Sequence, residues 1–230
     1  MSTILITGAN RGIGLELTRC YSARGDTVIA CCRAPEHADD LHQIKEQANA
    51  RIFIHQLDVT DKTSITALKA ALGSMAIDIL INNAGVIGPK TQTTQEMDFD
   101  GFLETLNINT VSPLRMLQAF LDPLKASAAP KAITISSVMG SFTNLATDRI
   151  AYRTSKAAVN RIMCAAAQDL KPDNIIIALI HPGWVKTDMG GPNAHITPPQ
   201  SAAGVVEVID NLNVDDSGGF FAWDRSTIAW

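Results

Sequence analysis

Short apolar runs alternate with longer segments of helical periodicity along the whole chain, and this alternation restricts the fold more than any other feature. The apolar runs cover residues 4–7, 27–32, 52–57, 77–81, 132–136 and 175–180, with a weaker one at 220–223. The helical segments lie near residues 12–24, 37–48, 61–73, 101–126, 150–170 and 199–212. Most runs are β-branched and nearly continuous, which is typical of strands buried on both faces of a parallel sheet. We therefore expect a single α/β domain over residues 1–230, a doubly wound fold with a mostly parallel seven-stranded sheet and helices on both faces.

Two residues at the predicted helix ends have the chemistry of helix caps. Asp61 precedes the third helical segment, where an Asp side chain can accept hydrogen bonds from the N–H groups of the first turn. Gly25 follows the first helical segment, where the left-handed backbone that ends many helices favours glycine. Both residues support the predicted boundaries.

Composition and charge exclude several classes of function. Nineteen Lys and Arg residues against twenty-three Asp and Glu residues give a formal net charge of −4, and no basic block occurs, so we expect neither a nucleic acid nor a membrane as partner. The four cysteines form no CxxC pair and no Cys/His cluster, so neither a disulfide framework nor a metal site is expected. The longest apolar stretch is far too short to span a membrane, and no signal-peptide pattern follows Met1. We expect a soluble, cytoplasmic protein.

The first apolar run leads directly into a glycine-rich segment, Thr7-Gly8-Ala9-Asn10-Arg11-Gly12-Ile13-Gly14, and then into a helical segment. Glycines at such a strand-to-helix turn let backbone N–H groups approach a pyrophosphate at the helix N-terminus. The spacing TGxxxGxG differs from the dinucleotide fingerprint GxGxxG, and the three glycines could also serve only a tight connection. The strand–loop–helix context favours dinucleotide binding.

Five further motifs follow in order between the predicted elements. They are NNAG at residues 82–85, Asn109 in the fourth helical segment, Ser136 and Ser137 at the end of the fifth run, YxxxK at 152–156, and HPGWVKT at 181–187. Together with the TGxxxGxG loop they resemble the short-chain dehydrogenase/reductase family, which implies a Rossmann fold and an oxidoreductase that interconverts a carbonyl and an alcohol. Residues 181–191 and 220–230 more closely resemble the branch that contains C-signal-like proteins and sniffer-type carbonyl reductases.

The resemblance implies a catalytic set of Asn109, Ser137, Tyr152 and Lys156. Tyr152 and Lys156 are four residues apart and share one face of a helix, where the ammonium should favour the phenolate form of the tyrosine. In the family, the Tyr is the general acid/base, the Lys also holds the nicotinamide ribose, the Ser binds the substrate oxygen, and the Asn holds a relay water. Ser137 precedes Tyr152 by fifteen residues instead of the family's thirteen, so Ser136 and Ser141 are alternatives to it.

Each of these side chains also has an ordinary structural interpretation. Tyr152 could pack one edge against the sheet, and Ser137 could cap a turn at the end of a strand. Asn109 could be only an irregular position in a helix, although Pro113, four residues later, has no N–H to donate to the Asn109 carbonyl. A helix through both positions should be kinked, which would leave that carbonyl free to hold a water.

The end of the second apolar run predicts the cofactor. Cys32 stands where NAD-preferring relatives have an acid, and Arg33 follows it, with Arg11 inside the glycine loop. Two guanidinium groups suit the 2′-phosphate of NADP(H), although both could also be solvated surface charges. By resemblance, the cofactor-binding set is Gly8, Asn10, Arg11, Gly12, Ile13, Gly14, Arg33, Asp58, Val59, Asn83, Ala84, Gly85, Tyr152, Lys156, Pro182, Gly183, Val185 and Thr187.

The substrate is predicted only as a class. Residues of about 187–198 correspond to the family's substrate lid, and this segment is short and rich in Gly and Pro. A short lid cannot enclose a large substrate, so we expect an open pocket and a small or medium carbonyl compound. Trp184 could either pack in the core or line that pocket beside the nicotinamide.

Two predictions concern partners and an alternative function. The helical segments near 101–126 and 150–170 carry apolar residues on more than one face, and the family pairs these helices across a twofold axis, so we expect a homodimer or homotetramer. C-signal-like relatives are associated with developmental signalling, so the alternative is a signalling or nucleotide-sensing protein with little or no turnover. The presence of all four catalytic residues favours the enzyme.

Overall fold

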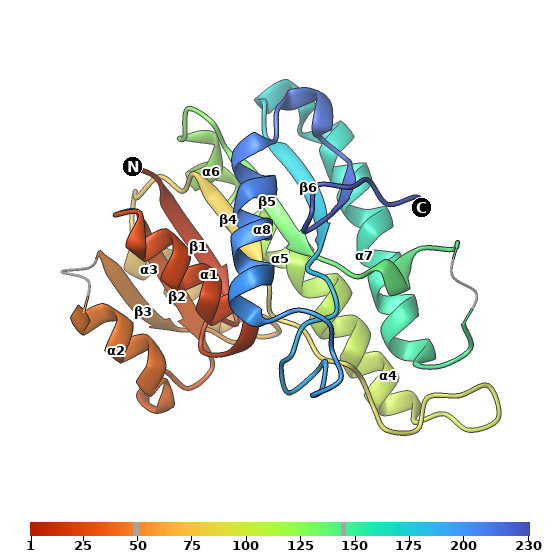
Figure 1. Cartoon of the computed structure of the whole chain (residues 1–230). Helices are drawn as coiled ribbons and strands as arrows, with labels where there is room; N and C mark the ends of the chain where they lie inside the picture. Colours follow the sequence, from red (N-terminus) through yellow and green to blue (C-terminus); the bar gives the residue numbers. More distant parts are fainter. Residues whose placement is uncertain (48–50, 144–145) are drawn as a thin grey trace.

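The computed structural model describes residues 1–47, 51–143 and 146–230. It consists of a seven-stranded sheet with helices on both faces (Figure 1). The strands are β1 (Thr3–Thr7), β2 (Thr27–Cys32), β3 (Ile52–Gln56), β4 (Ile79–Asn82), β5 (Lys131–Ile135), β6 (Ile176–His181) and β7 (Phe220–Ala222). Their order in the sheet is β3-β2-β1-β4-β5-β6-β7, and each neighbouring pair is parallel. The predicted fold class is confirmed, and each predicted strand lies within two residues of an observed one.

Eight α-helices join these strands in the described part of the chain. They are α1 (Gly12–Ala23), α2 (Asp39–Gln47), α3 (Lys62–Leu72), α4 (Phe99–Leu106), α5 (Ser112–Ala119), α6 (Leu121–Lys125), α7 (Ile150–Asp169) and α8 (Pro198–Asn211). Asp61 caps α3 by accepting a hydrogen bond from the Thr63 N–H at 2.8 Å, and Gly25 has φ +78° directly after the end of α1, as predicted. The predicted end of the second helix at residue 48 lies outside the described residues. No helix that the structure describes is long and apolar enough to cross a membrane.

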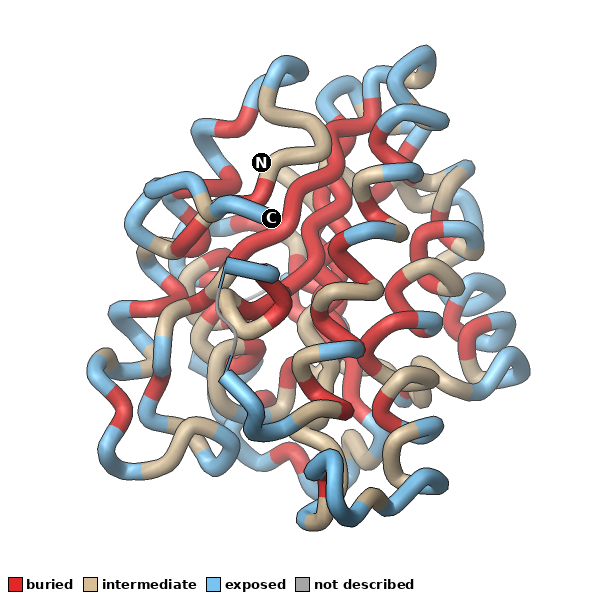
Figure 2. The backbone as a smooth tube through the Cα atoms, turned by 90° about the vertical axis from the view of Figure 1, so that its right-hand side faces the viewer, coloured by how far each residue is buried: buried red, intermediate tan, exposed pale blue. Residues whose placement is uncertain are grey.

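The helices bury one apolar cluster on each face of the sheet. On one face α1, α2 and α8 pack residues such as Leu17 against the strands, and on the other α3, α5, α6 and α7 pack residues such as Met163. Along β1, Ile4 and Ile6 belong to the first cluster and Leu5 to the second, because successive strand side chains point to opposite faces. The strands β1, β4, β5 and β6 in the middle of the molecule are therefore almost completely buried (Figure 2). Each fully buried aliphatic side chain there stabilises the fold by roughly 1.5–3 kcal/mol.

The predicted helix over residues 101–126 is wrong as a single element. It is divided into α4, a π-helical turn η2 (Asn107–Val111), α5 and α6. The Ser112 N–H and hydroxyl both donate to the Asn107 carbonyl, and Pro113 has no N–H to continue the regular pattern. Phe120, with ψ +17°, separates α5 from α6. The irregularity predicted from Pro113 is thus present, as a π-helical turn at Asn109.

The strand order locates the crevice where the sequence motifs meet. From β1 the chain proceeds to β2 and β3 on one side, and from β4 to β7 on the other, so the direction of winding reverses between β1 and β4. In open α/β sheets, ligands bind at the carboxyl ends of the strands at such a switch point. The glycine loop follows β1 and the NNAG segment follows β4, so both lie at this crevice.

Candidate active site

The glycine loop packs directly on the NNAG segment. The Thr7 hydroxyl accepts hydrogen bonds from the N–H groups of Asn83 and Ala84, both at 3.0 Å. The Asn83 amide donates to the carbonyls of Thr7 (2.9 Å) and Gly8 (3.0 Å). A Cβ on Gly14 would lie 2.3 Å from the Gly8 carbonyl oxygen, so only glycine fits there. These contacts explain the glycine spacing, and they give Asn83 a role in holding the loop.

The beginning of α1 fits a phosphate group. Arg11 precedes the helix with extended backbone and makes no side-chain cap, and the first turn contains no acidic residue. Among the described residues the N–H groups of this turn therefore have no side-chain acceptor, and they can bind an anion. Thr187 lies across the crevice from them, since a Cβ on Gly12 would be 3.3 Å from Thr187 Cγ2. The loop thus has the geometry that a dinucleotide pyrophosphate requires.

Three of the predicted catalytic side chains meet at the carboxyl end of β5. Ser137 follows β5, and its hydroxyl is hydrogen-bonded to the Tyr152 side chain from the first turn of α7. Lys156, one turn further along α7, places its Nζ 5.7 Å from the centre of the Tyr152 ring and donates to the Ile135 carbonyl at 2.8 Å. All three residues are buried.

The fourth predicted residue, Asn109, is a clamp behind this group. Its Oδ1 accepts from the Val86 N–H at 2.9 Å, and its Nδ2 donates to the Val86 carbonyl at 2.8 Å and to Ser155 Oγ at 3.0 Å. Ser155 Oγ in turn donates to the Tyr152 carbonyl at 2.7 Å. Asn109 therefore connects the segment after NNAG with the backbone of the helix that carries Tyr152.

The alternatives to Ser137 have other partners. Ser136 bonds to Asn160 Oδ1 at 2.5 Å, and Ser141 donates to the Ala229 carbonyl at 2.6 Å. Ser137 Oγ also accepts from the Met139 N–H at 3.2 Å, so it caps a turn and contacts Tyr152 at the same time. Of the three serines, Ser137 is the one placed against the tyrosine.

The electrostatics of Tyr152 differ from the sequence prediction. Burial raises the pKa of its phenol above the ordinary value, and the Ser137 hydrogen bond and the nearby Arg149 charge offset this only in part. Burial also lowers the pKa of Lys156 to about 8. Burial is therefore the larger effect on the Tyr152 pKa in this structure, and it opposes the acidification by the Lys156 ammonium that the sequence predicts.

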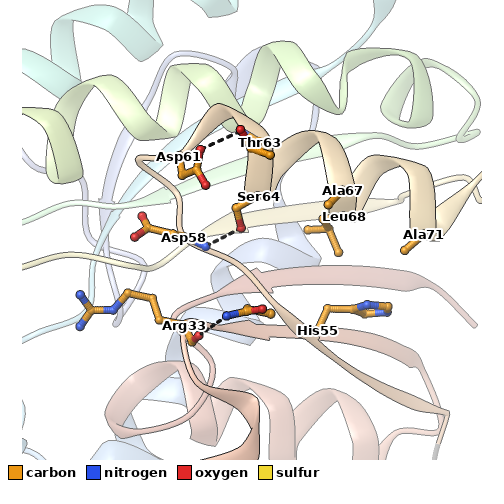
Figure 3. A pocket seen from close by; sticks show the side chains of 10 residues that line it. Arg33, His55, Asp58, Asp61, Thr63, Ser64, Ala67, Leu68 and Ala71 are labelled. Atoms are coloured by element: carbon orange, nitrogen blue, oxygen red, sulfur yellow. Dashed lines mark hydrogen bonds between the residues drawn. The ribbon is translucent and has the colours of Figure 1, made fainter.

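A hollow of about 500 Å³ lies between β3 and α3, away from Tyr152. Arg33 and Asp58 line it at the carboxyl ends of β2 and β3, and in Figure 3 both side chains point to the same side, away from His55 and Ala71. The pKa of Asp58 is lowered, chiefly by the Thr60 hydroxyl and also by the Arg33 charge. Two residues of the predicted cofactor-binding set, Arg33 and Asp58, thus place a cation beside a carboxylate at this hollow.

The segment after β6 crosses the crevice from the other side. Val185 pairs with Ile196, and the Trp184 carbonyl accepts from the N–H groups of His195 and Ile196, so the predicted lid has a fixed base. The indole of Trp184, 48% exposed, donates to the Gly190 carbonyl at 2.8 Å and contacts the His195 ring edge-on. Trp184 is therefore not a core residue; it supports the inside of the lid.

Arg11, predicted with Arg33 to meet a 2′-phosphate, is paired with Asp188 of the lid at 3.0 Å. The two side chains are 72% and 82% exposed. An ion pair this exposed contributes at most about 1 kcal/mol, so it links the lid to the glycine loop without fixing it.

The remaining predicted cofactor residues also lie along the crevice, in the segments after β1, β3, β4 and β6. They are Asn10, Ile13, Val59, Gly85, Pro182 and Gly183, of which Pro182 is buried and Gly183 has φ +86°. Among the described residues, no group of three or more His, Cys, Asp or Glu side chains is placed to hold a metal ion.

Sequence reasoning missed two residues of the site. Ser155 stands inside the YxxxK motif, and its place directly before Lys156 was the available signal. Gln92 lies in the loop after β4, and its side chain accepts a hydrogen bond from the Tyr152 N–H at 3.2 Å. No local pattern marks the contact of Gln92 with α7, because Tyr152 is sixty residues away in the sequence.

The fold and site define a class of enzyme. The family of short chain dehydrogenases matches residues 2–196, and the chain belongs to this family. It is therefore an oxidoreductase, as the sequence predicts.

The branch within the family is also the predicted one. The chain is 40% identical to the C-signal of Myxococcus xanthus over 155 residues, 67% of this chain and 93% of that protein. Its structure is similar to NADPH-bound carbonyl reductase from chicken fatty liver (34% identity, TM-score 0.94, covering 100% of this chain and 99% of that one). It is also similar to the carbonyl reductase Sniffer of D. melanogaster (32% identity, TM-score 0.92, covering 100% of both chains).

Proposed function

We propose that this protein is an NADP(H)-dependent reductase of small or medium carbonyl compounds, with Tyr152 as the proton donor. One observation carries the proposal: Tyr152 is hydrogen-bonded to Ser137 beside Lys156, at the same crevice as the glycine loop. The likeness to an NADPH-bound carbonyl reductase over the whole chain supports the cofactor and the reaction type.

The mechanism follows from the two hydroxyl groups. Ser137 and Tyr152 both donate hydrogen bonds to the substrate oxygen, and Tyr152 transfers its proton there as negative charge develops. The nicotinamide supplies the hydride when it is bound. Because burial raises the pKa of Tyr152, the acid is already in the protonated form that carbonyl reduction needs. The Lys156 ammonium stabilises the negative charge left on the phenol after proton transfer. A water bound to the Asn109 carbonyl completes the proposed proton relay.

The substrate class follows from the entrance to the site. Trp184, and Met189 in the proposed lid of residues 187–198, expose apolar surface. An exposed apolar entrance favours neutral, apolar carbonyl compounds. We expect NADPH oxidation with several aldehydes and ketones of this kind in a spectrophotometric panel. Absence of turnover with the whole panel, in protein that binds NADPH, would contradict the proposed reaction.

Cofactor selection provides a prediction about Arg33. We expect NADPH to bind at least about tenfold more tightly than NADH, because the Arg33 guanidinium gives the 2′-phosphate a charge-assisted contact. Replacing Arg33 by Ala should reduce this ratio, measured by fluorescence titration of both cofactors. The matched control is Arg161→Ala, which removes an exposed arginine on α7. Equal affinities for the two cofactors in the unaltered protein would rule out the assignment.

Assembly provides a second prediction. Phe99 and Leu103 on α4 are 71% and 65% exposed, and Val111 of η2 is 39% exposed, so this face is apolar and uncovered in the single chain. We propose that it pairs with a second copy in a homodimer or homotetramer. Light scattering at micromolar concentration should give two or four times the mass of one chain. Leu103→Glu should produce monomers. The control Phe53→Glu, at an exposed position of β3, should leave the mass unchanged. A monomeric unaltered protein would refute the proposed pairing of α4.

A second candidate function is signalling with little or no turnover, and the 40% identity to C-signal favours it. The intact group of Asn109, Ser137, Tyr152 and Lys156 supports the enzyme over this alternative. The carbonyl panel separates the two, because a signalling protein would bind the cofactor and leave it unoxidised.

A further inference from the structure

The helix that carries Tyr152 begins without a cap of its own. Arg149, at its N-cap position, is left-handed with φ +52° and makes no side-chain hydrogen bond to the first turn. The first intrahelical bond runs from the Arg153 N–H to the Arg149 carbonyl. The N–H groups of Ile150, Ala151 and Tyr152 precede it and need acceptors from outside the helix.

Gln92 supplies two of these acceptors from the loop after β4. Its main-chain carbonyl accepts from the Ile150 N–H at 3.3 Å, and its side-chain Oε1 accepts from the Tyr152 N–H at 3.2 Å. Gln92 is 5% exposed. A buried glutamine, distant in sequence, therefore caps the first turn of α7 at the tyrosine itself.

The other end of the same amide holds the loop that follows NNAG. The Nε2 group donates to the carbonyls of Ile87 at 3.1 Å and Pro89 at 2.6 Å. Gly88 between them has φ +88°, and a Cβ there would lie 3.3 Å from Gln92 Nε2. Both donors and the acceptor of this amide are thus engaged, which fixes its orientation.

We propose that Gln92 is a positioning residue for the reaction, acting through the backbone of Tyr152 to keep the phenol against Ser137. The inference rests on the proposed function for its kinetic part and on the hydrogen bonds alone for its structural part. Ser155 Oγ, which accepts a hydrogen bond from Asn109, donates to the Tyr152 carbonyl, and Gln92 accepts from the Tyr152 N–H. Displacement of a reacting group by about 1 Å can reduce the rate by up to ~100-fold.

The first test needs no substrate. In the unaltered protein the Tyr152 amide should exchange with deuterium more slowly than the Ala151 amide of the same turn, because a hydrogen bond must open first. In Gln92→Met, which keeps a side chain of similar length without the acceptor, exchange at Tyr152 should be at least about tenfold faster. Exchange at Ile150 should change less, because its acceptor is a main-chain carbonyl.

The control for this test is Thr93→Ala. The Thr93 hydroxyl bonds to the N–H and carbonyl of Glu96 in the same loop, and in the described part of the chain no hydrogen bond joins it to α7. This variant should leave Tyr152 exchange unchanged. Equal exchange rates at Tyr152 and Ala151 in the unaltered protein would overturn the proposal, and this comparison holds even if Gln92→Met does not fold.

The second test separates positioning from general stability. With kcat expressed per NADPH-binding site, Gln92→Met should lower kcat about tenfold and change the Kd for NADPH by less than about twofold. Thr93→Ala should retain the kcat of the unaltered protein. In a Ser137→Ala background the same Gln92 substitution should lower kcat less, because the partner against which Tyr152 is held is already missing. An unchanged kcat in Gln92→Met, or equal losses in both backgrounds, would refute the positioning role. A protein inactive in its unaltered form would instead refute the proposed function and leave the exchange test to decide.

Discussion

Replacing Tyr152 by Phe should lower kcat for carbonyl reduction by at least about 100-fold while the affinity for NADPH stays within about twofold. The ring and its packing are kept, and only the hydroxyl that bonds to Ser137 and donates the proton is lost. The measurement is steady-state NADPH oxidation, with cofactor binding followed separately by fluorescence.

The chain provides a matched control in its other tyrosine. Tyr21 is fully buried on α1, and its hydroxyl has no hydrogen-bond partner among the described residues. Tyr21→Phe therefore removes a hydroxyl that makes no hydrogen bond among the described residues, and kcat should stay within about twofold of the unaltered value. If Tyr152→Phe reduces a good substrate at a near-normal rate while folded and bound to NADPH, the assignment of Tyr152 is wrong and the signalling function becomes the better proposal.

Replacing Lys156 by Met should weaken both turnover and cofactor binding, each by at least about tenfold. Lys156 Nζ reaches the floor of the crevice, 3.7 Å from the position a Cβ on Gly85 would occupy, and it also lies over the Tyr152 ring. One ammonium thus serves the proposed ribose contact and the phenol, whereas the proposed role of the Tyr152 hydroxyl is proton transfer to the substrate. Lys171→Met, at an exposed position, is the control and should leave both values unchanged. Normal NADPH affinity in Lys156→Met would contradict the ribose contact.

The same substitution should change how stability depends on pH. Burial lowers the pKa of Lys156 to about 8 in the folded protein, against 10.5 as the ordinary value. Between these values the unfolded chain binds more protons than the folded one, so the free energy of unfolding contributed by this group rises with pH over that window. Urea unfolding without cofactor should show this rise in the unaltered protein relative to Lys156→Met. Parallel pH profiles for the two proteins would show that Lys156 is not desolvated.

Features that depend on residues close together in the chain could be predicted from the sequence. The register of Tyr152 with Lys156 follows from helical periodicity, and the glycine loop follows from the spacing of Gly8, Gly12 and Gly14 after a strand. Pro113 marked the break in the fourth helical segment, because the missing N–H is a property of the residue itself. The form of the break, a π-helical turn followed by two short helices, depended on how Ser112 bonds to Asn107.

The sequence could not decide which of the three serines, Ser136, Ser137 or Ser141, contacts Tyr152. Ser136 and Ser137 are adjacent at the end of β5, and successive residues of a strand point to opposite sides, so only one of them can reach Tyr152. Which one does so depends on the packing of α7 on the sheet, which places Ser136 against Asn160 and Ser137 against Tyr152.

The sequence by itself determined the α/β class, the parallel sheet, the dinucleotide loop and the Tyr152–Lys156 pair, since each depends on residue type and local spacing. Only the tertiary structure decided the clamp of Asn109 on Val86 and Ser155, the cap that Gln92 gives to α7, and the upward shift of the Tyr152 pKa. These depend on contacts between segments far apart in the chain and on burial, and desolvation of a side chain exists only once those segments have packed together.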